Sequence, residues 1–136
     1  MIIIDTCVFS LVFRRKERTR LEQQIVDSIE QMIRDDWPVV ILGIVYQELL
    51  SGIKPEKRRL ELAEALDAFP LILATKDHHR LAASIRGSCR SKGIDAGAID
   101  CLIAATAILE KGKLVTIDKY FQHMTKAVAI PFLELS

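Results

Sequence analysis

The sequence predicts an α/β protein, a single-domain α/β/α sandwich with a mainly parallel central sheet. Short apolar runs alternate along the chain with longer segments of helical periodicity. Residues 2–4 are three consecutive isoleucines, a pattern typical of a parallel strand that is covered on both faces. Residues 99–109 contain one charged side chain, so we expect a helix that is buried on all sides. With 136 residues, half of them hydrophobic, the chain can bury one core.

The first half of the chain is expected to contain two strands and four helices. Trp37-Pro38 breaks a helix and introduces the second strand. Gly52 is expected to close the third helix, and Pro55 suits the first position of the fourth. The expected elements are, in order, a strand at 2–4, helices at 6–13 and 18–34, a strand at 39–42, and helices at 44–50 and 55–68.

The second half is expected to alternate in the same way. Asp77 is expected to cap a helix, and Gly112 to end the buried one. Pro131 is expected to terminate an edge strand. The expected elements are a strand at 70–73, a helix at 77–92, the buried helix from 97 to Gly112, a strand at 114–117, a turn or short helix at 119–124, and an edge strand at 127–130.

Three of these helices carry an apolar stripe that is expected to face the core, with charged residues opposite. The stripes are Leu21, Ile25, Ile29, Met32 and Ile33 in the helix at 18–34, Leu60, Ala63 and Leu66 in the helix at 55–68, and Leu81, Ile85 and Cys89 in the helix at 77–92.

Composition excludes several classes of protein. The net charge of +1 by itself predicts no polyanion partner, although residues 14–20 concentrate five positive charges against one negative. Three cysteines without C-x-x-C spacing indicate neither a disulfide framework nor a thiolate zinc site. His78, His79 and His123 are expected at the surface, because no pair shows zinc-ligand spacing with a third ligand. Without a membrane-length apolar run or a secretory leader, we expect a cytoplasmic protein.

Two carboxylates are expected at one edge of the sheet. Asp5 and Asp118 each end an apolar strand, and parallel α/β sheets bind ligands at the carboxyl ends of their strands. Asp100 lies at the start of the buried helix, where it could instead serve only the helix start, since backbone N–H groups favour an anion there. Glu48 could be a solvated helix residue, and Asp118 an ordinary turn residue.

Four short segments, each with one acid, are informative together. They are Ile-Ile-Ile-Asp5-Thr6, Glu48-Leu-Leu-Ser-Gly52, Asp100-Cys-Leu-Ile-Ala-Ala-Thr-Ala107 and Leu-Val-Thr116-Ile-Asp118-Lys-Tyr-Phe121. In this order and spacing they resemble the PIN-domain family, and most closely its VapC-type toxin ribonucleases from toxin–antitoxin pairs. The resemblance spans nearly the whole chain and implies one PIN domain over residues 1–136.

The resemblance implies a Mg²⁺-dependent endoribonuclease that hydrolyses RNA phosphodiester bonds. Its catalytic acids match Asp5, Glu48, Asp100 and Asp118. Asp5, Asp100 and Asp118 are expected to hold the metal, and Glu48 to orient water or accept a proton. Several carboxylates this close repel one another, and a divalent cation with a preference for oxygen ligands removes the conflict. Mn²⁺ would fit the same ligands.

Neighbouring side chains are expected to support these acids. The hydroxyl groups of Thr6 and Thr116 are candidate donors to the carboxylates. The chain departs from the family pattern at Cys7, where the family often has Asn or Ser. It departs again at Tyr120-Phe121, where the family often has a further acid or polar residue before the aromatic one.

Partners follow from the basic run and from the resemblance. Arg14, Arg15 and Lys16 are candidates for contact with the RNA backbone, and a solvated charged turn is the alternative. The resemblance implies a homodimer held inactive by a cognate antitoxin, contact with operator DNA only through that antitoxin, and no membrane. The alternatives are a housekeeping RNA-processing PIN nuclease without an antitoxin, and a non-catalytic RNA-binding module.

Overall fold

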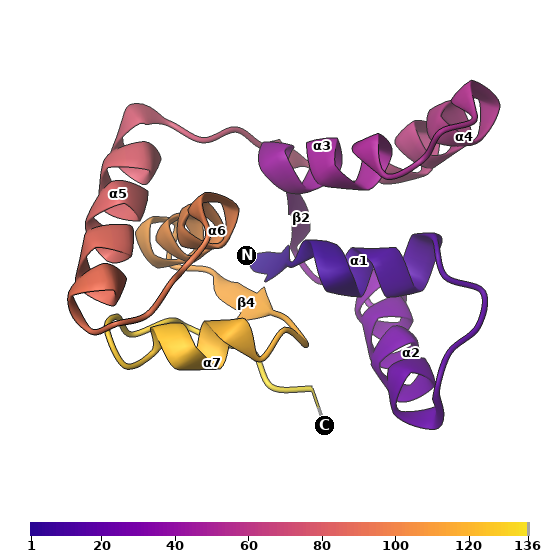
Figure 1. Ribbon diagram of the computed structural model, residues 1–136. Helices are drawn as coiled ribbons and strands as arrows, with labels where there is room; N and C mark the ends of the chain where they lie inside the picture. The colour runs from indigo at the N-terminus through magenta and orange to yellow at the C-terminus, as the bar shows by residue number, and fades with distance from the viewer. Residues whose placement is uncertain (136) are drawn as a thin grey trace.

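A four-stranded, all-parallel sheet forms the centre of the molecule, with the spatial order β3-β2-β1-β4. The computed structural model describes residues 1–135, and Figure 1 shows the sheet between two groups of helices. The strands are β1 Ile2–Ile4, β2 Val39–Leu42, β3 Leu71–Ile72 and β4 Lys113–Val115. This architecture confirms the predicted α/β/α sandwich.

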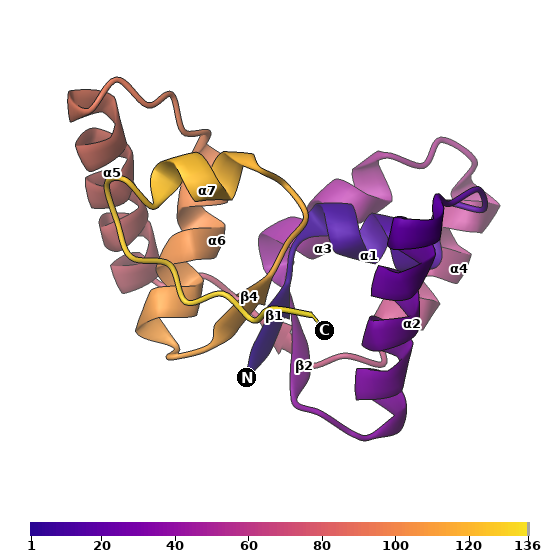
Figure 2. The same cartoon turned by 90° about the horizontal axis from the view of Figure 1, so that it is seen from below.

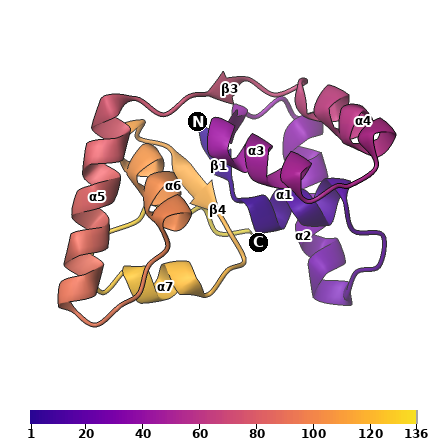
Figure 3. The same cartoon turned by 45° about the horizontal axis from the view of Figure 1, so that its top comes forward.

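Helices cover both faces of the sheet. They are α1 Thr6–Phe13, α2 Arg20–Arg34, α3 Gly43–Ser51, α4 Glu56–Leu66, α5 Lys76–Ser91, α6 Ala98–Leu109 and α7 Tyr120–Met124. Figures 2 and 3 show α1 to α4 on one side and α5 to α7 on the other. The chain therefore passes from one layer of helices to the other once, between α4 and α5, through β3.

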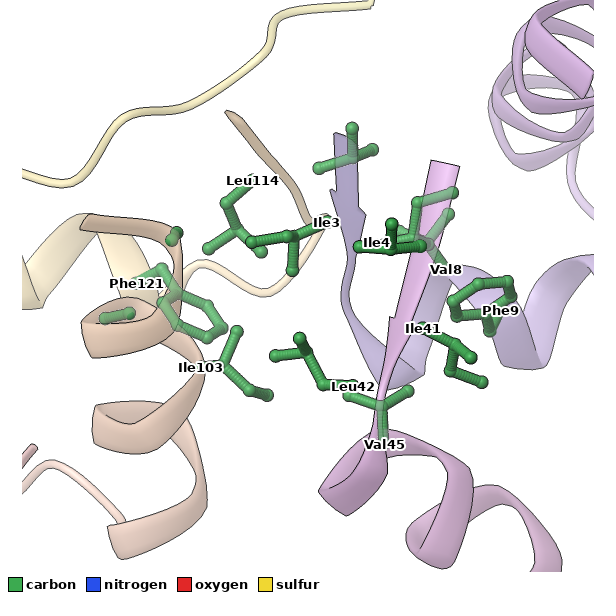
Figure 4. Packing of buried hydrophobic residues seen from close by; sticks show 14 of the residues in the cluster. Ile3, Ile4, Val8, Phe9, Ile41, Leu42, Val45, Ile103, Leu114 and Phe121 are labelled. Carbon is green, nitrogen blue, oxygen red and sulfur yellow. The ribbon is translucent and has the colours of Figure 1, made fainter. Parts of the chain in front are cut away.

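The core lies on both faces of β1 (Figure 4). Successive strand residues point to opposite faces, so Ile3 packs toward Ile103 and Phe121 of α6 and α7, while Ile4 packs toward Val8 and Phe9 of α1. All six are fully buried. Each such side chain stabilises the fold by ~1.5–3 kcal/mol relative to an exposed position.

The turn between α6 and β4 fixes the direction of α6. Lys111 takes a left-handed conformation with φ 53°, and Gly112 donates its N–H to the carbonyl of Ala107 at 2.9 Å. A Cβ at Gly112 would lie 3.1 Å from both the Ile3 side chain and the Met1 carbonyl, so glycine lets the turn pass close to β1. Because the chain reverses here, the start of α6 lies at the edge where the parallel strands end.

Two expected strands differ from the structure. The strand expected at 114–117 ends at Val115, so Asp118 is not a strand residue. Residues 127–130 form no strand, because Ile130 is the only buried residue among them and anchors an irregular segment. The chain pairs beyond Pro131 instead, where Leu114 bridges Phe132 in parallel.

The predicted apolar stripes are partly wrong. Leu21 is 67% exposed and Leu60 is 57% exposed, although both have the expected helical spacing. Ile33 is also exposed. The buried face of each helix is displaced from the predicted stripe, since it includes Val26 in α2 and Leu62 in α4, which the stripes left out. The residues buried there are Val26, Ile29 and Met32 in α2, and Leu62 and Leu66 in α4.

The start of α5 corrects two further expectations. Thr75, not Asp77, is the N-cap, and its side chain accepts from the N–H of His78. His78 is 3% exposed rather than at the surface, because its Nε2 lies 2.8 Å from Oε1 of Glu110. His79 and His123 are exposed, as expected.

The three cysteines differ in burial. Cys89 and Cys101 are buried and Cys7 is half-buried, and the three are free thiols. None of the helices within residues 1–135 combines the length and the apolar character that crossing a membrane requires.

Candidate active site

Asp5 lies at the carboxyl end of β1, in the middle of a hydrogen-bond network. It is the N-cap of α1 and only 4% exposed. Its Oδ1 accepts from the N–H of Thr6 at 2.7 Å, and its Oδ2 accepts from the hydroxyl of Thr116 at 2.8 Å and the thiol of Cys7 at 3.2 Å. A buried carboxylate requires such partners, because its charge is costly away from water.

The thiol of Cys7 is a part of the site that sequence reasoning missed. Burial and the neighbouring charge of Asp5 raise the pKa of Cys7 to about 12. The thiol therefore stays protonated and donates to Asp5, in the position where the resemblance suggests Asn or Ser. A signal was present, since a residue two positions after an N-cap carboxylate lies within reach of it.

Glu48 lies in α3, and its side chain is hydrogen-bonded to α1. The hydroxyl of Thr6 donates to Oε1 of Glu48 at 2.7 Å. Thr6 donates its backbone N–H to Asp5 at the same time, so a single residue connects the two acids. This is the supporting role expected for Thr6, and it leaves Oε2 of Glu48 outside that bond.

Asp118 lies three residues beyond the end of β4. The hydroxyl of Thr116 donates to Asp5 and accepts from the N–H of Asp118 at 3.0 Å, which ties this loop to β1. Oδ1 of Asp118 accepts from the N–H of Tyr120, the first residue of α7, at 2.9 Å. Asp118 is therefore a turn residue and is also linked to Asp5 through Thr116.

Asp100 lies in the first turn of α6 and is half-buried. Desolvation is the main cause that raises its pKa to about 6, and the carboxylates of Asp5, Asp118 and Glu48 raise it further, in that order. An effect of this kind requires the four acids to lie within electrostatic reach of one another. The start of α6 therefore faces the same edge of the sheet as the ends of β1 and β4.

The chemistry of these donors suits a hard divalent cation. All four are carboxylates, which Mg²⁺ and Mn²⁺ prefer, and a cation would relieve the repulsion at Asp100. In the observed side-chain positions, however, no three His, Cys, Asp or Glu residues within 1–135 form a group that could hold a metal ion. The donor set thus fits a metal in charge and chemistry, while the carboxylates are spread more widely than coordination requires.

The basic run divides into residues with different partners. Arg14 reaches the carbonyl of Gly52 at 3.4 Å, and Arg15 pairs with Glu22 at 3.0 Å. Lys16 is exposed. Arg18 turns back to the end of α1, where it donates to the carbonyls of residues 11 and 12. It is therefore a helix-end residue rather than a free cation.

Comparison with known proteins decides the family. The PIN domain model matches residues 2–127. This chain belongs to the PIN domain family. No curated protein matches the chain.

Several solved structures share the fold over nearly the whole chain. FitAcB from Neisseria gonorrhoeae is 24% identical, covers 92% of this chain and 94% of its own, and has a TM-score of 0.74. VapBC2 from Rickettsia felis, bound to a DNA fragment from its promoter, is 22% identical with full coverage of both chains and a TM-score of 0.74. DNA-bound VapBC from Salmonella typhimurium is 19% identical, covers 97% and 96%, and has a TM-score of 0.73.

Proposed function

We propose that this PIN domain is a Mg²⁺-dependent endoribonuclease and the toxic component of a type II toxin–antitoxin module. The observation that carries the proposal is the environment of Asp100 at this edge of the sheet, where burial raises its pKa and the charges of three other acids raise it further. Carboxylates that repel one another at a sheet edge destabilise the apo protein, and binding of a divalent cation offsets that cost. Membership of the PIN domain family supports a nuclease.

The proposed roles follow from the contacts of each residue. Asp5, Asp100 and Asp118 would hold the metal, which when bound would lower the pKa of a water molecule and offset charge on the phosphoryl oxygens. Glu48 would orient that water or accept its proton. The bond from Thr6 fixes one oxygen of Glu48 and leaves the other for this task. The buried network around Asp5 holds its carboxylate in one orientation.

The toxin assignment rests on the structures that the chain resembles. FitAcB and the two VapBC structures match its fold over 92–100% of its length, and a toxin–antitoxin complex from Klebsiella pneumoniae matches it over 88%. Two of these structures contain DNA. We therefore propose a homodimeric, cytoplasmic toxin with a cognate antitoxin that inhibits it and carries it to operator DNA.

The experiment compares RNA cleavage and metal binding in matched variants. Asp5→Asn and Asp100→Asn should each abolish Mg²⁺-dependent cleavage and weaken Mn²⁺ binding in calorimetry, with an unchanged circular dichroism spectrum. Asp95→Asn is the control, because Asp95 is exposed and lies only five residues before Asp100. Full cleavage activity in Asp100→Asn would contradict the proposal.

A growth assay tests the toxin assignment separately. Expression of the wild-type chain should arrest growth, and expression of Asp100→Asn should not. A cleavage-active wild type that leaves growth unaffected would favour the housekeeping nuclease instead.

A further inference from the structure

We propose that a basic cavity beside the acidic site binds the phosphate backbone of the RNA strand, at nucleotides beyond the bond that is cut. The cavity has a volume of about 420 Å³ and lies where α1 ends, α3 ends and α4 begins. Its charged and hydroxyl-bearing residues are Ser10, Arg14, Arg15, Lys54 and Arg58. The inference rests on the proposed nuclease function, and it names the phosphate backbone as the part of the RNA substrate that this cavity would bind.

Most of the positive charge of the cavity has no acidic partner among the described residues. Four of its lining residues are cations and none is a carboxylate. Within residues 1–135, Arg14, Lys54 and Arg58 form no ion pair, and Arg15 pairs only through an exposed contact with Glu22. Guanidinium and ammonium groups without an acidic partner are available to phosphate oxygens.

Gly52 builds one wall of the cavity. Arg14 donates from Nη2 to the carbonyl of Gly52, and a Cβ at Gly52 would lie 2.5 Å from that nitrogen. The guanidinium group therefore lies directly against the glycine, where any side chain would displace it. The partner of Arg14 is a carbonyl at the end of a helix, so its positive charge is not neutralised.

The cavity is connected to the acidic site by two neighbouring helices. α1 and α3 meet at the Thr6–Glu48 bond near the acids, and again where Arg14 reaches Gly52. Figures 1 and 3 show the two helices side by side, both leading away from the sheet. Eight residues of α1 separate Thr6 from Arg14, which corresponds to about 12 Å along the helix axis. A strand cut at the acids would therefore place a later phosphate in the cavity.

The chemistry favours a nucleic acid backbone as the occupant. No aromatic side chain lines the cavity, so bases have no stacking surface there. Four acids near the scissile bond repel a polyanion, and cations placed further along the strand offset this repulsion by releasing counterions. An acidic peptide could use the same cations, but nothing would direct it onward to a cluster of carboxylates.

The test measures RNA binding in EDTA, where no cleavage occurs, by the fluorescence anisotropy of a labelled single-stranded RNA. Lys54→Ala/Arg58→Ala removes two contacts, so the slope of log K against log salt should become shallower by about 1.4. Affinity at about 0.1 M salt should fall by roughly 10- to 30-fold. Lys57→Ala/Lys113→Ala is the control, since it removes the same charge from exposed positions outside the cavity.

A second variant keeps the charge and changes only the geometry. Gly52 has φ −77°, which alanine tolerates, so Gly52→Ala should fold and displace the guanidinium group of Arg14. RNA binding should weaken several-fold while the net charge and the melting temperature stay the same.

Three results would overturn the inference. One is an affinity and salt slope for Lys54→Ala/Arg58→Ala equal to those of the control. Another is a wild type that does not bind RNA in EDTA. The third is a Lys54→Ala/Arg58→Ala variant that binds RNA as well as the wild type but no longer binds a labelled polyglutamate peptide. This result would assign the cavity to a protein partner. Because none of these measurements involves cleavage, they are independent of whether Asp100→Asn abolishes activity.

Discussion

Thr116 connects the two acidic ends of β1 and β4 through one hydroxyl group. It donates to the buried carboxylate of Asp5 and accepts from the backbone of Asp118. Without it, Oδ2 of Asp5 would keep only the weak thiol donor of Cys7. A residue outside the acidic set therefore controls the orientation of one acid and the loop that carries another.

Thr116→Val should lower Mg²⁺-dependent RNA cleavage by about 10- to 100-fold, the usual cost of losing a partner that orients a metal ligand. Thr116→Ser keeps the hydroxyl and should retain most of the activity. Steady-state cleavage rates of the two variants check this expectation, and equal rates would show that the hydroxyl does not position Asp5.

Asp100 makes the apo protein less stable at neutral pH. Its pKa in the folded protein is about 6, above the ordinary value of 3.8, so folding favours the protonated form. The contribution of this carboxyl group to stability is fully present below pH 3.8. It is lost as the pH rises through about 6 and does not change further above that. Binding of the proposed cation would offset this loss of stability.

Asp100→Asn should therefore stabilise the apo protein at about pH 8, by on the order of 1 kcal/mol after allowance for the partial exposure of the group. The gain should shrink as the pH falls from about 6 toward 4. Urea denaturation in EDTA at several pH values measures it, with Asp95→Asn as the control. A pH-independent effect would mean that the ionised form of the Asp100 carboxylate is not its origin.

At the scale of elements, helical spacing alone does not identify the buried face. Leu21 and Ile29 belong to the same stripe in the sequence, yet Leu21 is 67% exposed and Ile29 is fully buried. Periodicity reports where an apolar face exists, whereas burial depends on the neighbours that cover it. In α2 the turn nearest the basic run extends past the elements that cover the rest of its face.

Ile29→Ala should destabilise the protein by about 2–5 kcal/mol, because it leaves a cavity in the core. Leu21→Ala should change the free energy of unfolding by less than about 0.5 kcal/mol. Chemical denaturation of the two variants checks the contrast. Comparable losses would mean that the exposed end of α2 is covered in solution.

Elements that depend on local signals were predictable. The isoleucine run of β1 and the apolar sequence of α6 are strong enough to define a strand and a helix without tertiary information. The segment at 127–130 was not, since a short apolar run is equally compatible with an irregular segment anchored by Ile130. Likewise, the sequence did not predict that His78 would accept from the N–H of Thr75 in a capping box while its other ring nitrogen lies against Glu110.

For the whole molecule, chain order predicted the family but not the contacts between its parts. The sequence predicted that the buried helix stops at Gly112, but spacing did not show that the tight turn there brings Asp100 to the edge where β1 ends. The Thr6–Glu48 bond joins residues 42 positions apart. Such contacts come from tertiary packing. The sequence therefore identified the candidate site residues, and the folded structure showed which of them contact one another.

Net charge conceals the electrostatic layout of the molecule. A value of +1 results from acids and cations that lie in different places, with four acids at the sheet edge and four cations in the basic cavity. Separation of the two signs along α1 would suit the polyanionic substrate that we propose, since cations would bind it beside a cluster of carboxylates. The net charge does not show where these acids and cations lie, whereas the folded structure does.

Anomalous diffraction from crystals soaked in Mn²⁺ tests the central claim most directly, because it locates the cation without reference to activity. We expect one strong peak between the carboxylates of Asp5, Asp100 and Asp118, with these side chains drawn closer together than in the apo protein. A peak elsewhere, or none at this edge of the sheet, would contradict the account.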